Sequence, residues 1–116
     1  MDKIIVQAYQ EGNKPDVLTQ FLDKLNDKND VKKVRKLIRI LEIQGRELAY
    51  PLSKFLGSGI YELRDRSCGI RVYYTFIGNA LAILLVLGDK TSQKTDIERA
   101  QSRRLKLLDA YKEILR

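Results

Sequence analysis

Three closely spaced strand-like runs between Gly59 and Lys94 constrain the fold of this chain more than any other stretch. The first run, 61–65, alternates apolar and polar side chains, as a strand with one buried face requires. The second run, 71–77, alternates in the same way. The third run, 80–87, is apolar on both faces, which is typical of a central strand that is covered on both sides. The stretch therefore predicts a sheet built from two consecutive hairpins.

The loops between these runs predict which residues face each other. The loop 66–69 has an even number of residues, so it keeps the apolar faces aligned and places Arg64 opposite Arg71. The next connection, 78–79, is a Gly-Asn pair, and both residues tolerate the positive φ of a two-residue hairpin turn. Counting outward from this turn places Arg71 opposite Val86 on the third strand.

This register predicts a cluster of cations at one end of the sheet. Two arginines directly opposite each other repel, so the pairing of Arg64 with Arg71 suggests an anion between them. Lys90 continues the third strand on the same face, and Glu62 and Tyr73 lie one step along that face. Three cations beside a carboxylate and a phenol suit a phosphodiester ligand. The alternative is that these are ordinary solvated cations on a strand surface.

The composition limits the classes of protein that the chain can belong to. The 116 residues suit a single domain spanning 1–116, and a 44% hydrophobic content indicates a globular protein. The formal net charge of +7 favours an acidic partner such as nucleic acid. No long apolar segment is present, so we expect a cytoplasmic protein with no membrane contact. With one cysteine, Cys68, and no histidine, we expect no metal site and no cofactor.

The residues before the hairpins predict one strand and two helices. The apolar residues at 4–8 indicate a strand at an edge of the sheet or beside the later hairpins. Apolar residues at helical spacing predict a first helix over 15–26 and a second over 31–44. Asp30 is the predicted N-cap of the second helix, and Gly45 is predicted to end it.

The remaining segments complete a predicted α+β fold. The segment 46–59 lacks clear periodicity and predicts a connecting loop, in which Lys54 adds a cation near the cluster. Thr95 and Glu98 have the spacing of a capping box, which predicts the start of a final helix there. The predicted fold is a small, twisted, antiparallel sheet with two N-terminal helices packed on one face and a C-terminal helix.

Three motifs occur in order in the second half of the chain. They are G-I-Y-E-L-R, then G-I-R-V-Y-Y four residues later, and then L-G-D-K-T-S-Q-K-T-D-I-E-R-A after an apolar strand. In these motifs the chain resembles the RelE/ParE superfamily of toxins, and within it the HigB and phage-derived branch. The resemblance implies a toxin of RelE-like fold that enters the ribosomal A site and cuts the mRNA being translated. It also implies a cognate antitoxin protein that holds the toxin inactive.

The resemblance implies roles for the clustered residues. Arg71 matches the arginine that nucleases of the family use at the scissile phosphate. Arg64 matches a basic position on the preceding strand, and Lys90 matches one just after the last strand. Several relatives use histidine as the acid or base, and this chain has none. Glu62 is therefore the candidate carboxylate for proton transfer, with a lysine as the alternative. No metal is required, because RNA supplies its own 2′-hydroxyl nucleophile.

Contacts to RNA are expected both beside the cluster and on the second helix. Hydrogen bonds to phosphates can come from the side chains that follow Lys90, which are Thr91, Ser92, Gln93 and Lys94. Tyr73 either stacks on a base or belongs to the core. Cations on one face of the second helix either follow ribosomal RNA phosphates or are simply solvated. The predicted RNA-binding residues are Lys94, Tyr73, Lys54, Lys32, Lys36 and Arg39.

Two other functions fit the same sequence. The superfamily includes ParE-like toxins, which are not enzymes but bind and inhibit DNA gyrase. Such a toxin would leave mRNA intact and cause DNA damage. A plain RNA-binding module would bind RNA in a salt-dependent way and would not be toxic. The predicted convergence of three cations favours the nuclease, since a gyrase-binding protein does not need it.

Overall fold

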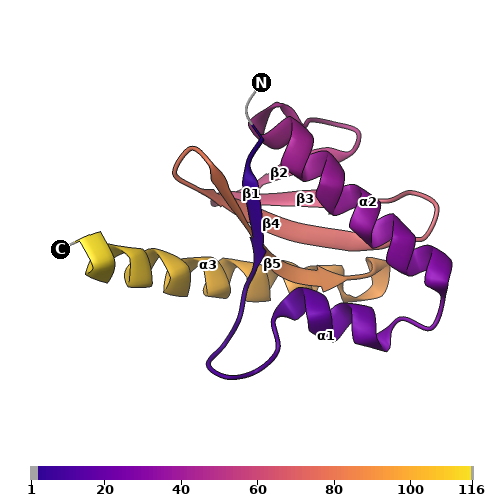
Figure 1. Ribbon diagram of the computed structural model, residues 1–116, viewed down its shortest axis with the longest axis horizontal. Coiled ribbons are helices and arrows are strands. Elements are labelled where there is room, and N and C mark those ends of the chain that lie inside the picture. The colour runs from indigo at the N-terminus through magenta and orange to yellow at the C-terminus, as the bar shows by residue number, and fades with distance from the viewer. Residues whose placement is uncertain (1–2, 116) are drawn as a thin grey trace.

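In the computed structural model, which describes residues 3–115, a five-stranded sheet lies between helices on its two faces (Figure 1). The strand order is β1-β5-β4-β3-β2. β1 pairs in parallel with β5, and the other neighbours are antiparallel, so the sheet is mixed where the sequence predicted an antiparallel one. The strands are β1 Ile5–Ala8, β2 Ser53–Gly57, β3 Ile60–Arg64, β4 Arg71–Ile77 and β5 Leu81–Gly88.

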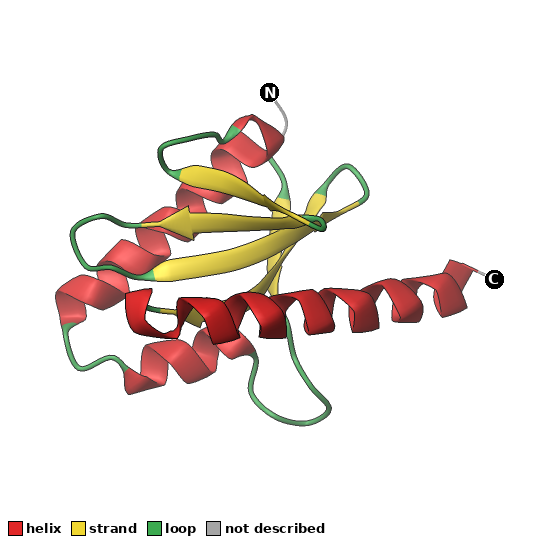
Figure 2. Ribbon diagram, turned by 180° about the vertical axis from the view of Figure 1, so that it is seen from behind, coloured by secondary structure: helices red, strands yellow, loops and turns green. Residues whose placement is uncertain are grey.

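Helices cover both faces of the sheet, and the two N-terminal helices pack on one face, as the sequence predicted. The N-terminal helices are α1, Val17–Lys24, and α2, Lys28–Gln44, and α3 spans Gln93–Leu115. Figure 2 shows α3 across the opposite face of the sheet from α2. Apolar residues of α2 and most of those of α1 pack on one face, and Ala100 of α3 is buried on the other. This arrangement confirms the predicted α+β fold. None of the described helices is long and apolar enough to cross a lipid bilayer.

The two N-terminal helices begin at other residues than those predicted. α1 begins at Val17, because the Asp16 carboxylate accepts a hydrogen bond from the amide of Thr19 at 2.9 Å. α2 begins after Asp27, whose carboxylate serves as the N-cap. Asp30, the predicted cap, lies inside the first turn, where a negative charge still interacts favourably with the helix dipole.

The segment predicted to be a connecting loop contains a strand. β2 pairs with β3 alone and forms the far edge of the sheet. The turn that follows it uses left-handed backbone at 57–59, with φ values of 92°, 51° and 73°. A short strand that has one neighbour and is flanked by proline and glycine leaves little periodic signal in the sequence. The loop prediction was therefore wrong for residues 53–57.

The registers of the two hairpins differ in how well the sequence predicted them. Arg64 pairs with Arg71 across β3 and β4, as predicted. The β4–β5 connection spans 78–80 rather than two residues, and a bulge between Tyr73 and Tyr74 shifts the register again. Arg71 consequently pairs with Gly88, and the predicted register for this hairpin was wrong.

The last helix also starts earlier than predicted. The Asp89 carboxylate accepts hydrogen bonds from the amides of Thr91 and Ser92, at 2.8 and 3.3 Å. The Ser92 hydroxyl in turn accepts one from the Asp89 amide, which completes a capping box for the 3-10 helix η2, Lys90–Ser92. This short helix runs directly into α3. Thr95 therefore lies within α3, and the predicted capping box at that position was wrong.

Candidate functional site

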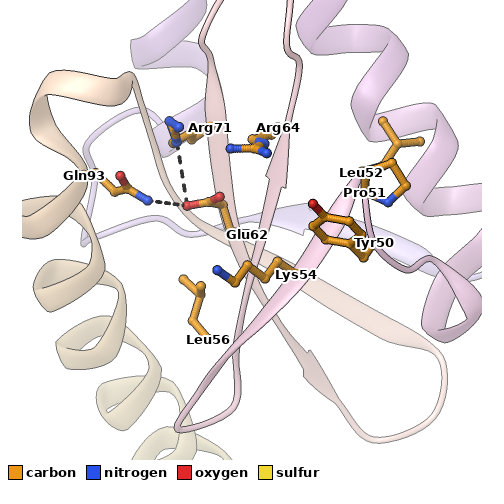
Figure 3. A pocket seen from close by; sticks show the side chains of 9 residues that line it. All are labelled: Tyr50, Pro51, Leu52, Lys54, Leu56, Glu62, Arg64, Arg71 and Gln93. Carbon is orange, nitrogen blue, oxygen red and sulfur yellow. Dashed lines mark hydrogen bonds and ion pairs between the residues drawn. The ribbon is translucent and has the colours of Figure 1, made fainter.

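The alternation of β3 and β4 brings the predicted site residues to one face of the sheet. Glu62 pairs with Tyr73, and Arg64 pairs with Arg71, so all four side chains point to the same side. Lys54 of β2 pairs with Glu62 and extends this set toward the sheet edge. The face is the one that α3 covers, and α3 begins beside these residues (Figure 3).

Two adjoining hollows open on this face. The first, which we call the β2 hollow, has a volume of about 250 Å³, and the second, the Lys90 hollow, has a volume of about 380 Å³. Arg64 and Arg71 line both of them. The β2 hollow is lined by Tyr50, Pro51, Leu52, Lys54, Leu56, Glu62, Arg64, Arg71 and Gln93, and the Lys90 hollow by Arg64, Asp65, Arg66, Gly69, Arg71 and Lys90.

The Lys90 hollow brings together the three cations that the sequence placed at one end of the sheet. Arg64 and Arg71 come from paired strand positions, and Lys90 comes from η2 after the last strand. Arg66, from the hairpin loop, adds a fourth cation against the one carboxylate of Asp65. An excess of positive charge around an open hollow favours an anionic ligand.

Arg71 is the most buried of these cations, and part of its guanidinium group has no hydrogen-bond partner among the described residues. Its side chain is 10% exposed, and its Nε and Nη1 atoms are buried without a hydrogen-bond acceptor among the described residues. Its nearest charged partner is Glu62, with 3.7 Å between Nε and Oε2. A guanidinium group stays charged and is costly to bury without acceptors. An oxyanion in the hollow would supply the missing acceptors, and a planar guanidinium can bind two of its oxygens at once.

Glu62 links the sheet to the start of α3. The residue is 4% exposed, and its Oε2 accepts a hydrogen bond from Nε2 of Gln93 at 2.9 Å (Figure 3). The same oxygen faces Arg71. Glu62 therefore lines the β2 hollow beside Arg71, and it does not line the Lys90 hollow.

Tyr73 belongs to the core. Its exposure is 0%, and its ring packs in the cluster that α3 covers. Burial, and next the negative charge of Glu62, raise the pKa of the Tyr73 hydroxyl well above its usual value. The ring has no free face on which a base can stack, so the core interpretation of Tyr73 is the correct one.

The other predicted RNA-binding residues lie at two separate places. Lys54 is exposed and lines the β2 hollow, and Lys94 is exposed in the first turn of α3. The remaining three are exposed along α2, across the sheet from Arg71, and the described residues that line the two hollows include none from α2. These three, Lys32, Lys36 and Arg39, form what we call the α2 stripe.

The loop between β3 and β4 is shaped by hydrogen bonds to Asp65. Its Oδ1 accepts from the amides of Ser67 and Cys68, at 2.7 and 3.3 Å. These bonds, with that of the Ser67 hydroxyl first, lower the pKa of Asp65. Burial raises the pKa of the Cys68 thiol, which keeps it protonated at neutral pH. The structure thus gives Cys68 no sign of an activated nucleophile.

Sequence reasoning missed some of the residues that shape the site. Tyr50 is 72% exposed and lines the β2 hollow, although it lies in a segment without periodicity. Gln93 was expected only as one of several possible phosphate donors, but it holds Glu62, which lies 31 residues earlier. For Arg66 the sequence predicted only a place in the hairpin loop. For Tyr50, an aromatic residue directly before a proline is the one signal that the sequence offers.

The fold and the site together define a class: a small basic α+β domain that presents buried and exposed cations around an open hollow, as phosphate-binding proteins do. Residues 20–105 match the family described as "Phage derived protein Gp49-like (DUF891)". The chain belongs to this Gp49-like family, whose members are RelE/ParE-like toxins associated with toxin-antitoxin systems. No curated protein matches the chain.

Proposed function

We propose that this protein is the toxin of a type II toxin-antitoxin system and cuts translated mRNA in the ribosomal A site, as in the HigB and phage-derived branch. The observation that carries the proposal is the buried guanidinium of Arg71. Its Nε and Nη1 atoms lack hydrogen-bond acceptors within residues 3–115, and the side chain lines an open hollow with Arg64 and Lys90. Membership of a RelE-like toxin family, whose members are generally endoribonucleases, supports the same activity.

The proposed reaction needs no metal ion. The 2′-hydroxyl of the RNA loses its proton and attacks the adjacent phosphorus, and a new oxygen–phosphorus bond forms. The bond to the 5′-oxygen of the next nucleotide breaks, and that oxygen takes up a proton and leaves as a hydroxyl group. The protein must align these atoms and stabilise the added negative charge on the phosphate oxygens. Arg71 donates to those oxygens, and Arg64 and Lys90 supply supporting charge. One such donor contributes about 3 kcal/mol to transition-state stabilisation.

Glu62 is our candidate for the group that takes the 2′-hydroxyl proton. It is the carboxylate beside Arg71 in the β2 hollow. The alternative role of Glu62 is to hold Arg71 in place. The variant Glu62→Gln distinguishes this positioning role from that of a base. If Glu62 is the base, the variant loses the acidic limb of the pH–rate profile. If Glu62 only positions Arg71, the rate falls but the profile keeps its shape.

Partners follow from the same proposal. Lys54 and Lys94 contact the mRNA at the rim of the site, and the α2 stripe contacts ribosomal RNA phosphates from the other side of the sheet. Family membership implies a cognate antitoxin. We place it over the Arg71 face or along α3, where it blocks access to RNA.

Primer extension on an mRNA, with and without translating ribosomes, tests the function. We expect the wild type to cut only when ribosomes are present. Arg71→Ala should reduce cleavage on the order of a hundredfold or more. Lys14→Ala removes the same charge from an exposed loop and should cleave normally. Circular dichroism shows whether each variant is folded.

The result that overturns the nuclease proposal is intact mRNA in every reaction of the folded wild type. A gyrase supercoiling assay then tests the ParE-like alternative. The three-cation site would instead be rejected if Arg71→Ala, Arg64→Ala and Lys90→Ala each cleaved as fast as the wild type.

A further inference from the structure

We propose that the β2 hollow is a nucleobase subsite, in which Tyr50 stacks on the base next to the phosphate bound in the Lys90 hollow. The proposal rests on the proposed function, because it takes the ligand to be RNA. It assigns a role to Tyr50, Pro51 and Gln93, which are not part of the cation cluster.

The arrangement of the two hollows fits one nucleotide and its phosphate. Arg64 and Arg71 line both hollows and so form the boundary between them. When Arg71 binds a phosphate in the Lys90 hollow, the nucleoside attached to that phosphate can reach the β2 hollow. Unlike the Lys90 hollow, the β2 hollow has an aromatic side chain, Tyr50, and the aliphatic side chains of Leu52 and Leu56 among its lining residues.

Tyr50 is suited to stacking because its ring is exposed. The residue is 72% exposed, whereas Tyr61 and Tyr74, on the opposite face of the sheet, stack on each other with 5.3 Å between ring centroids. Figure 3 shows Tyr50 at the edge of the hollow, across from Gln93, with Glu62 between them. An aromatic ring with free surface beside a cationic site is the usual platform for an unpaired base.

The floor of the hollow can bind the edge of a base. The Glu62 carboxylate accepts hydrogen bonds but donates none when ionised, so Gln93 must present its amide nitrogen to it. This fixes the orientation of the Gln93 amide and leaves its carbonyl oxygen and its second N–H for a ligand. A donor beside an acceptor is the pattern with which amide side chains pair with base edges. The Gln93–Glu62 bond thus orients the group that reads the base.

Binding of a short, nuclease-resistant 2′-O-methyl oligoribonucleotide tests the subsite without any cleavage. Each position in turn is replaced by an abasic residue, and affinities are measured by fluorescence anisotropy. In the wild type we expect an abasic residue at one position to weaken binding about tenfold. Tyr50→Ala should bind the intact and the abasic oligonucleotides equally, and Tyr50→Phe should behave like the wild type.

Phe55→Ala is the matched control. Phe55 is also an exposed aromatic residue, but it follows Lys54 on β2 and so faces the other side of the sheet. This variant should keep the full abasic penalty. The subsite is rejected if no position shows a penalty in the wild type, or if Tyr50→Ala keeps the wild-type penalty. A Tyr50-dependent penalty without mRNA cleavage would reject the nuclease proposal and keep the subsite.

Discussion

At the scale of one residue, the burial of Arg71 lowers the stability of the folded protein. The Arg71 guanidinium group has one carboxylate at 3.7 Å, and its buried Nε and Nη1 atoms have no hydrogen-bond acceptor in the described part of the chain. Such burial is unfavourable in the folded protein. Arg64, which pairs with Arg71 across the strands, adds like-charge repulsion. Both features make sense in a site that binds an anion, because the ligand removes the cost.

The double variant Glu62→Gln/Arg71→Met tests this trade-off. It replaces a buried, poorly bonded ion pair with neutral groups of similar size, so we expect the free energy of unfolding to rise by about 1 kcal/mol. Cleavage should be lost in the same protein. Thermal unfolding monitored by circular dichroism measures the change. A double variant that unfolds at a lower temperature than the wild type would contradict the assignment of strain to this pair.

The buried tyrosines predict a loss of stability at alkaline pH. Burial raises the pKa of Tyr74 to about 12, although its hydrogen bond with Ser53 at 2.6 Å opposes this, and the pKa of Tyr73 is also raised. In the unfolded chain tyrosine titrates near pH 10, so the folded state holds protons that the unfolded state releases. Their contribution is therefore complete below about pH 10 and is lost as the pH rises toward 12.

Tyrosinate absorbance and circular dichroism, followed together through this range, check the expectation. Part of the tyrosinate signal should appear only as the fold is lost. Tyr74→Phe should remove a share of that late signal. If all the tyrosines ionise near pH 10 while the protein stays folded, the assigned shifts are wrong.

At the scale of elements, the capping of η2 holds Lys90 beside the arginines. Asp89 accepts from Thr91 and Ser92, so Asp89→Ala should lower the free energy of unfolding by about 1 kcal/mol. Cleavage should fall as well, because Lys90 follows the cap directly. Asp89→Asn keeps a good N-cap and is the control. Chemical denaturation and primer extension measure the two effects, and equal behaviour of both variants would argue against the cap.

The pH dependence of this cap follows from its hydrogen bonds. The side-chain bond with Thr91, before the backbone bonds, lowers the pKa of Asp89 below its usual value of 3.8. The stabilisation is therefore present above the pKa of the unfolded chain and is lost as the pH falls through the lower, folded value. At neutral pH the cap is fully formed.

The elements also show which parts of the fold the sequence could predict. The β3–β4 register follows from a loop with an even number of residues, and it was correct. The β4–β5 register was wrong because the Gly78 turn suits two loop lengths and because a bulge depends on packing. The longer loop and the bulge each shift the pairing by one, so Arg71 moved from Val86 to Gly88 and stayed on the same face. The two errors in the predicted register therefore cancel with respect to the face, and the predicted cation cluster forms.

The part of the site that the sequence could not predict depends on distant contacts. Gln93 is the first residue of α3, and it contacts Glu62 only because the start of this helix lies beside β3. Tyr50 reaches the hollow only because an unpredicted strand, β2, carries the preceding loop to the sheet edge. Neither position has a local pattern, since an exposed aromatic residue and a helix N-terminal amide are both common.

At the scale of the whole molecule, cations lie on both faces of the sheet. The Lys90 hollow is on the α3 face, and the α2 stripe is on the other. With a formal net charge of +7, the molecule is suited to a surrounding polyanion rather than to a single acidic patch. A ribosomal cleft lined by RNA would contact both faces together.

The triple variant Lys32→Ala/Lys36→Ala/Arg39→Ala tests the α2 stripe. Fewer neutralised phosphates should weaken ribosome binding and make its salt dependence shallower. Cleavage at saturating ribosome concentration should stay close to that of the wild type, because the stripe lies across the sheet from Arg71. Cosedimentation with ribosomes at increasing salt measures the effect. An unchanged salt dependence would show that the stripe is merely solvated.

The parallel pairing of β1 with β5 affects how the chain folds during synthesis. β1 is made first, yet its partner in the sheet is the last of the five described strands to be made. Until β5 has left the exit tunnel, β1 has no strand to pair with and β4 has only one neighbour. The cation cluster, which needs β3, β4 and η2, forms later still. The assembled cation cluster is therefore absent from the nascent chain until its synthesis has passed η2.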